Sequence, residues 1–356
     1  KVRIPELFAA EMIAFDAGAL VSAKFKTRQL RLENGTASVV RSKDGVWTLA
    51  DIVLAREPDA SDKPFDPIRD LNWTTLATPL RALISAGDFE QVELANFRLN
   101  IDDQKSGTKW SANPVAGNWS AKKDGVAINL DATLVDALAG EPNAIKIAIV
   151  SDGDVTRAAG KLTLQGVDPM SIAKMFGYTG DGFSSGKPAS ATFSVAATEK
   201  GGLQSTKLSL ADVTGSGHFA DQTIMVRDLA FDAAYDPATK QITLEKLKID
   251  SDRLSGEFSG SMDASAIMRG DTKSPTPFKL AGTGFTLGFT PVFEAPWQFA
   301  SAEIEASLAP DARRVTVTSL KAVTGGLDAV ASGEVWLEGE GDAQQLGVKG
   351  TAVGTG

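Results

Sequence analysis

The stretch QITLEKLKIDSDRLSGEFSGSMDAS, residues 241–265, contains the pattern on which the predicted fold of this 356-residue chain depends. Apolar residues alternate with polar ones at Ile242 and Leu244, two polar residues follow in a row, and the alternation resumes at Leu247 and Ile249. In a regular β-strand, residues i, i+2 and i+4 lie on one face. The extra residue therefore moves the second half of the apolar set to the opposite face, unless the strand contains a β-bulge.

The same one-residue interruption recurs along the chain. It is found at residues 47–54, 92–99 and 224–231, and in part at residues 315–320. A β-bulge accommodates the extra residue, returns the apolar side chains to one side and bends the strand. We therefore interpret these segments as bent strands with one apolar face. The alternative is that each segment is two short strands joined by a kink and buried on different faces.

Further strand-like segments, separated by turns rich in glycine, aspartate, asparagine and serine, occupy most of the remaining sequence. About fifteen strands with few helices are expected, and open sheets of more than about ten strands rarely stay flat. The predicted fold class is therefore mainly β: an elongated, strongly curled, groove-like antiparallel sheet with one or two short helices. Two stacked β-sandwich domains are the alternative.

Two segments have helical features. Residues 67–85 place apolar side chains close to a helical period, and Pro79 is expected to kink this helix. In DPMSIAKMFG, residues 168–177, Asp168 is the predicted N-cap, Pro169 takes the first helical position and Gly177 follows the end. We expect the first helix to cap one edge of the sheet, with a position on a membrane surface as the alternative.

Composition narrows the classes of function. The net charge of −9 argues against a nucleic-acid partner, which favours a basic surface. The chain has no cysteine and one histidine, His218, which leaves little for metal or nucleophilic chemistry. Asp152 and Asp154 are better explained by a hairpin turn than by a calcium loop. We expect no enzyme activity, no cofactor and no metal site, and no apolar run is long enough to span a bilayer as a helix.

Three passages carry a resemblance to a known family. Residues 23–55, AKFKTRQLRLENGTASVVRSKDGVWTLADIVLA, contain two strands and a closing DG-W-L element. Residues 160–177, GKLTLQGVDPMSIAKMFG, form a strand-to-short-helix step, and residues 208–262 contain recurring strand pairs. Together the passages resemble the AsmA-like superfamily of bacterial envelope proteins, in particular its YhdP/TamB-type branch.

The resemblance implies a long groove that is U-shaped in section and has an apolar interior. It implies a non-enzymatic conduit or tether that carries phospholipid between the inner and outer membranes, in the periplasm of a Gram-negative bacterium. The implied partners are phospholipid acyl chains and the membranes at the ends of the full-length protein, which is expected to be anchored in the inner membrane. The chain begins with Lys1 and ends within a strand-like pattern, so we expect it to be a fragment.

On this interpretation the chain has three parts: an N-terminal AsmA-like β element (residues 1–60), a helical linker or edge cap (61–90), and a repetitive β-groove region (91–356). The predicted groove lining consists of apolar side chains, most of them from the interrupted strands: Leu94, Phe97, Leu99, Ile224, Val226, Leu229, Leu244, Leu247, Ile249, Phe258, Phe285 and Phe289. The alternative function is a structural or adhesive β-repeat module of the cell envelope with closed sandwich cores.

Overall fold

The computed structural model describes residues 12–15, 29–49, 52–56, 91–105, 107–122, 125–135, 143–152, 154, 156–170, 183–198, 202–219, 222–268, 273–288, 295–310, 313–338 and 345–355. The chain divides into two compact units. Unit 1 comprises Lys1–Gly166 and Thr192–Thr206, and unit 2 comprises Val167–Ala191 and Lys207–Gly356.

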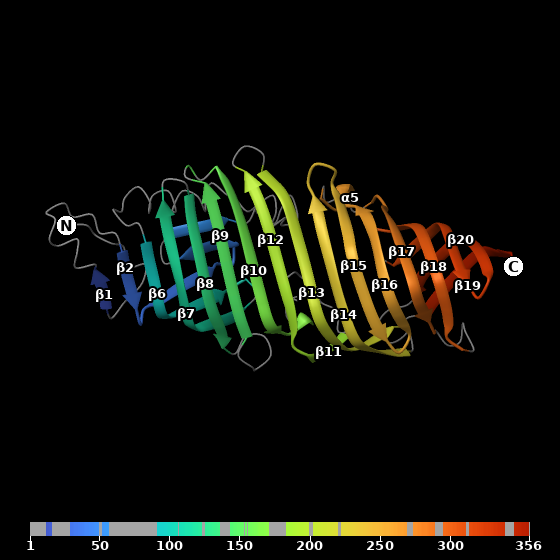
Figure 1. Cartoon of the computed structure of the whole chain (residues 1–356), viewed down its shortest axis with the longest axis horizontal. Helices are drawn as coiled ribbons and strands as arrows, with labels where there is room; N and C mark the ends of the chain where they lie inside the picture. Colours follow the sequence, from blue (N-terminus) through green and yellow to red (C-terminus); the bar gives the residue numbers. More distant parts are fainter. Residues whose placement is uncertain are drawn as a thin grey trace. The chain divides into compact units, whose positions relative to one another are not determined.

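Unit 1 is built from strands. In chain order they are β1 (Met12–Phe15), β2 (Gln29–Glu33), β3 (Thr36–Arg41), β4 (Val46–Leu49), β5 (Ile52–Arg56), β6 (Gln91–Asp103), β7 (Thr108–Lys122), β8 (Gly125–Val135), β9 (Asn143–Asp152) and β10 (Arg157–Val167). From β6 to β10 each strand pairs antiparallel with the next (Figure 1). The first half of β6 pairs in parallel with β2, and its second half pairs in parallel with β3. β1 pairs with β2, and β4 pairs with β3.

The junction between β2 and β3 lies beside a bulge in β6. Asn34 and Asn96 both adopt left-handed backbone conformations, with φ of 55° and 52°. Asparagine tolerates this conformation better than most other residues. Asn96 Nδ2 donates to Asn34 Oδ1 at 2.6 Å, and the Asn34 N–H donates to the Ala95 carbonyl at 3.1 Å. β2 and β3 therefore follow β6 as two halves of one interrupted strand.

Unit 2 is also built from strands. They are β11 (Phe183–Lys187), β14 (Gln222–Asp236), β15 (Gln241–Ser251), β16 (Leu254–Asp263), β17 (Thr276–Leu287), β18 (Trp297–Leu308), β19 (Arg314–Thr324), β20 (Leu327–Glu338) and β21 (Gln345–Thr355), with the short helix α5 (Ser265–Met268). From β14 to β21 each strand pairs antiparallel with the next, as the yellow-to-red part of Figure 1 shows. β12 (Ala189–Thr198) and β13 (Gly202–Phe219) contribute residues to both units.

The predicted fold class is confirmed in its main features. The described residues are mainly β, and their sheet is antiparallel, strongly curled and unclosed, with the β2–β6 and β3–β6 pairs as parallel exceptions. Asp168 is the N-cap that its sequence predicts, because its Oδ1 accepts a hydrogen bond from the Met170 N–H at 3.1 Å. Residues 171–177 and the helix predicted at residues 67–85 lie outside the described residues.

Four of the five predicted interruptions are β-bulges. In β15, Leu244 pairs with Gly260 and Leu247 pairs with Phe258, so β15 contains one more residue than β16 in this interval. The apolar side chains on both sides of the bulge are half-buried, and the polar residues between them are exposed. Register shifts at the predicted places also occur in β6, β14 and β19. The bulges keep the apolar side chains on one face.

The prediction of a bulged strand at residues 47–54 is wrong. This segment folds back on itself as the hairpin β4–β5, in which Leu49 pairs with Ile52. A two-residue hairpin loop and a β-bulge each insert extra residues between two alternating segments, so the pattern is the same for both.

Candidate functional site

The strand register of unit 2 determines which side chains share a face, because residues paired across antiparallel strands point to the same side. Leu229 and Phe231 of β14 pair with Ile249 and Leu247 of β15, and Leu247 pairs in turn with Phe258 of β16. We call this side the apolar face of unit 2. From β14 to β19 it carries Ile224, Val226, Leu229, Phe231, Ile242, Leu244, Leu247, Ile249, Leu254, Phe258, Met262, Phe278, Leu280, Ala302, Ile304, Ala306, Leu308, Val315, Val317, Leu320 and Ala322.

Most of the apolar face is half-buried. Its small side chains Ala302, Ala306 and Ala322 are buried, whereas its leucine, isoleucine and valine side chains remain partly accessible. Among the described residues of the chain, Val167 is the largest side chain that is fully buried. A closed β-sandwich core buries large apolar side chains between two layers. The apolar face of unit 2 therefore lacks the burial expected of such a core.

The opposite face of the same strands carries polar and charged side chains. Cross-strand ion pairs join Lys248 to Asp228 at 2.8 Å, Lys279 to Glu305 at 2.6 Å, Lys246 to Glu257 at 3.2 Å and Arg314 to Glu334 at 3.6 Å. The hydrogen bond between Lys279 and Glu305 raises the pKa of the lysine and lowers the pKa of the glutamate. Exposed pairs of this kind contribute little to stability. They identify this face as the solvated one.

An aromatic cluster interrupts the aliphatic side chains of the apolar face. Phe285 is buried and packs with Ala302 and Ala322. Its ring centroid lies 5.3 Å from that of Phe258 and 4.8 Å from that of Phe299, and the Phe285 and Phe299 rings are stacked with an interplanar angle of 8°. Such ring pairs add roughly 0.5–1.5 kcal/mol beyond the area they bury. The cluster joins β16, β17 and β18.

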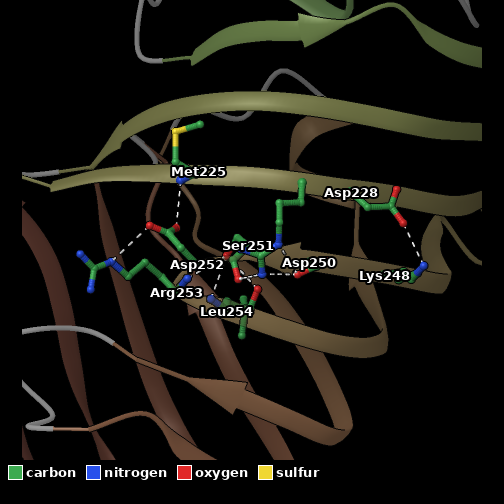
Figure 2. Close-up of polar contacts among 9 residues, drawn as sticks. Met225, Asp228, Lys248, Asp250, Ser251, Asp252, Arg253 and Leu254 are labelled. Carbon is green, nitrogen blue, oxygen red and sulfur yellow. Dashed lines mark hydrogen bonds and ion pairs between the residues drawn. The ribbon is translucent and has the colours of Figure 1, made fainter.

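The turn between β15 and β16 is tied to both neighbouring strands (Figure 2). The Ser251 hydroxyl donates to the Leu254 carbonyl and accepts from the Leu254 N–H, each at 2.8 Å. Asp252 accepts a hydrogen bond from the Met225 N–H of β14 at 2.9 Å. On the other side, the Gly288 N–H donates to the Arg253 carbonyl at 2.8 Å. These bonds hold one end of the apolar face in place.

Unit 1 has a corresponding apolar face. Leu94 of β6 pairs with Gly117 of β7, Gly117 pairs with Leu130 of β8, and Phe97 pairs with Val115. The face carries Leu32, Leu94, Phe97, Leu99, Ala112, Val115, Trp119, Val126, Ile128, Leu130, Ile145, Ile147, Ile149, Leu162 and Leu164. Phe97, Val115 and Val126 are buried, and most of the others are half-buried.

The predicted lining residues fall into two groups. Leu94, Phe97 and Leu99 lie on the apolar face of unit 1. On the apolar face of unit 2 the register brings together Val226, Leu229, Leu244, Leu247, Ile249 and Phe258, alternation along β14 adds Ile224, and ring packing adds Phe285. Phe289 lies outside the described residues. That these side chains line a groove stays a prediction.

Sequence reasoning missed several members of the same face. Phe231, Met262, Phe278 and Leu280 are paired in register with predicted lining residues or with their neighbours. Their signal was present, because each occupies the apolar phase of a predicted strand. The sequence pattern did not indicate which strand lies beside each of these residues.

The Asp152 carboxylate is hydrogen-bonded by residues that follow it closely in the chain. Its carboxylate accepts hydrogen bonds from the Thr156 hydroxyl and the Thr156 N–H, each at 2.6 Å, and from the Arg157 N–H at 3.1 Å. The bond from the Thr156 hydroxyl is the largest cause of the lowered pKa of Asp152. In the part of the chain that the structure describes, no group of three or more acidic or histidine side chains is arranged to hold a metal ion. These contacts account for Asp152 as a turn residue.

Comparisons with protein-family models, with curated proteins and with solved structures found no match for this chain. The resemblance to the AsmA-like superfamily therefore remains a prediction from the sequence. Within the described residues, no helix has the length and apolar character needed to cross a bilayer.

Proposed function

We propose that this chain is a non-enzymatic lipid conduit, whose apolar face lines a groove that carries the acyl chains of phospholipid. The observation that supports the proposal is continuity: from β14 to β19 every strand presents apolar side chains on the same face. The proposed setting, the periplasm between the inner and outer membranes, rests on the sequence resemblance alone.

The energetics of lipid transfer favour such a surface. Moving an acyl chain into water costs about 0.8 kcal/mol for each exposed CH₂ group, or roughly 12 kcal/mol for a sixteen-carbon chain. An apolar face provides shielding without any covalent chemistry. The bulges favour a groove, because they bend each strand while keeping its apolar side chains on one side. The ion pairs on the opposite face keep that surface in water.

A structural or adhesive β-repeat module is the rival function. In such a module two apolar faces pack together and bury each other's large side chains. The half-burial of Leu244, Leu247 and Ile249 favours the conduit over the closed module.

The test combines native mass spectrometry with lipid extraction of the purified chain. We expect phospholipid to be released from the wild type in more than one copy. Leu247→Asp places a charge on the apolar face and should abolish lipid binding while the circular dichroism spectrum stays that of a folded β protein. Thr243→Asp is the matched control, because Thr243 lies on the same strand but is exposed. It should retain lipid.

Two results would contradict the proposal. One is a wild-type chain that contains no lipid and does not transfer a pyrene-labelled phospholipid between vesicles. The other is a Leu247→Asp chain that unfolds while Thr243→Asp remains folded, which would assign Leu247 to a closed core.

A further inference from the structure

One end of the apolar face of unit 2 lies at the turn between β15 and β16, and we call it the open end. Leu254, which follows this turn, pairs with Leu287 of β17, and Leu287 pairs with Trp297 of β18. Thr324 of β19 pairs with Leu327 of β20, and its hydroxyl donates to the carbonyl of the residue after Trp297 at 2.6 Å. The apolar side chains of the open end are therefore Leu254, Leu287, Trp297 and Leu327.

Apolar side chains at the open end are in contact with water. Trp297 is 46% exposed and Leu327 is 37% exposed, although both belong to paired strands. A large apolar side chain that stays exposed at the margin of an apolar surface is typical of a site that binds a partner or a lipid.

The opposite end of the same strands is more enclosed. The short helix α5 follows β16 there, and we call it the α5 end (Figure 1). Ala264, Ala266 and Thr276 are buried at this end. The apolar side chains nearest to it are all half-buried, and they are Met262, Phe278, Leu308 and Val315. The two ends of the apolar face therefore differ in their access to solvent.

A series of aromatic rings leads to the open end. Phe285 is buried, Phe299 stacks on it, and the Trp297 ring centroid lies 6.2 Å from that of Phe299. The series therefore begins inside the apolar face and ends in water. Tryptophan favours the boundary between hydrocarbon and water, because its ring is largely apolar and also carries a polar N–H group. Trp297 is thus suited to the level at which the acyl chains of a lipid meet its head group.

A cation and an anion lie beside the open end. Arg253 Nη1 donates to the carbonyl of Gly288, the residue after Leu287, at 3.5 Å. Asp252 Oδ2 lies 3.9 Å from Arg253 Nε, and the two side chains are 35% and 29% exposed (Figure 2). A zwitterionic head group carries a phosphate, which an arginine attracts, and an ammonium group, which an aspartate attracts. The open end therefore offers an opposite charge to each charge of such a head group.

The apolar face is long enough to hold acyl chains lengthwise along its strands. Phe278 and Leu287 lie toward opposite ends of β17, and nine residues of strand correspond to roughly 30 Å. The hydrocarbon of one leaflet is about half of a bilayer core, or roughly 15 Å thick. A lipid that lies along the strands can therefore extend its head group past one end and keep its chains on the face.

We propose that a zwitterionic phospholipid lies along the strands of unit 2, with its head group at the open end beside Trp297 and its acyl-chain ends toward the α5 end. The inference rests on the proposed function and adds the orientation of the lipid and the class of its head group. The reverse orientation would place a hydrated, charged head group against the more enclosed end, and removing charges from water is costly.

The test is photo-cross-linking of phosphatidylcholine to the full chain. One probe carries a diazirine on its head group, and the other carries it at the end of an acyl chain. Mass-spectrometric sequencing then locates the labelled residues. In the wild type, the head-group probe should label the open end severalfold more than the α5 end, and the chain-end probe should show the opposite ratio.

Two tryptophan variants form a matched pair for the same measurement. Trp297→Ala removes the ring at the open end, so head-group labelling of Leu254 and Leu287 should fall severalfold. Trp336 lies on the solvated face, where it pairs with Arg314, and Trp336→Ala should keep the wild-type pattern. Circular dichroism establishes that the variants are folded, and the wild-type ratios decide the orientation in either case.

Competition tests the class of the head group. Unlabelled phosphatidylcholine should reduce labelling of the open end more effectively than phosphatidylglycerol with the same acyl chains, because an anionic head group has no ammonium group for Asp252. Equal competition by the two lipids would overturn the preference for a zwitterionic head group.

The remaining outcomes separate the orientation from the proposed function. Equal labelling of both ends by both probes, or reversed ratios, would overturn the orientation and leave the conduit intact. An unchanged pattern in Trp297→Ala would overturn the contact with Trp297. Labelling confined to the apolar face of unit 1 would overturn the site in unit 2, whereas no labelling of either apolar face would overturn the proposed function as well.

Discussion

Phe258 of β16 and Gly282 of β17 are directly paired, and the phenylalanine ring lies against the glycine backbone. A Cβ atom at position 282 would lie 2.6 Å from Cδ1 and 2.7 Å from Cε1 of Phe258, and 3.3 Å from Cδ1 of Phe285. The ring occupies the space of the missing side chain. Because Gly282 has no Cβ, the rings of Phe258 and Phe285 lie close to the backbone of the sheet on the apolar face of unit 2.

The contact predicts that Gly282→Ala destabilises the protein. The added methyl group has to displace one or both rings, and overpacking of this kind costs roughly 1–3 kcal/mol. Thermal unfolding followed by circular dichroism measures the effect. Gly160→Ala is the control, because a Cβ there meets Val195 Cγ1 at an ordinary 3.5 Å. Equal losses of stability in the two variants would show that the ring contact is not the cause.

The bulge in β15 predicts that the strand tolerates deletion of Glu245. The deletion leaves Leu244 and Leu247 two positions apart, so the apolar side chains stay on one face and β15 can pair residue for residue with β14 and β16. Deletion of Lys248 is the matched variant, because it lies in a regular part of the strand and its removal turns Ile249 toward the solvated face. Denaturant unfolding should show a loss of about 2 kcal/mol or more for the Lys248 deletion and a clearly smaller loss for the Glu245 deletion. Equal losses in the two deletion variants would contradict the bulge.

Arg41 and Asp103 are predicted to be energetically coupled. They are paired in register across β3 and β6, and Arg41 Nη1 lies 2.9 Å from Asp103 Oδ2. Their side chains are only 18% and 11% exposed, so removal of one leaves its partner poorly solvated. Arg41→Ala and Asp103→Ala should each cost about 1–3 kcal/mol, and the double variant should cost less than their sum. Strict additivity would exclude the coupling.

An exposed pair serves as the reference for that cycle. Lys146 and Asp131 lie 3.6 Å apart, with side chains 64% and 66% exposed. Well-solvated ions gain little from each other, so the same cycle on this pair should show no measurable coupling.

The solvated face of unit 2 predicts a loss of stability in acid. Hydrogen bonds from Lys279 and Arg227 lower the pKa of Glu305 and of Asp250 in the folded protein. As the pH falls, the two carboxylates therefore bind protons in the unfolded chain before they do so in the folded protein. Their contribution to the free energy of unfolding is fully present above the ordinary pKa values of 4.5 and 3.8, and it is lost as the pH falls through the lower pKa values of the folded protein. Unfolding temperatures measured from neutral pH to below about pH 4 should decline. Glu305→Gln should decline less steeply than the wild type, and an identical decline would contradict the assignment.

Much of the local structure was predictable from the sequence. The polar pair at Glu245 and Lys246 indicated the bulge of β15, and the order Asp168–Pro169 indicated the start of a helix. The same reasoning failed at residues 47–54, because a two-residue hairpin loop interrupts the alternation as a bulge does. The glycine at position 282 gave no signal of its role, since the ring that lies against it comes from another strand.

The sequence by itself determined which side of each strand is apolar and where an extra residue interrupts it, because side chains alternate along an extended backbone whatever lies beside it. Only the tertiary structure decided which strands are neighbours. It placed β2 and β3 in parallel beside β6, and it brought Leu254 and Trp297 to one end of the apolar face of unit 2. Strand pairing depends on contacts between residues far apart in the chain, and no local pattern specifies the partner.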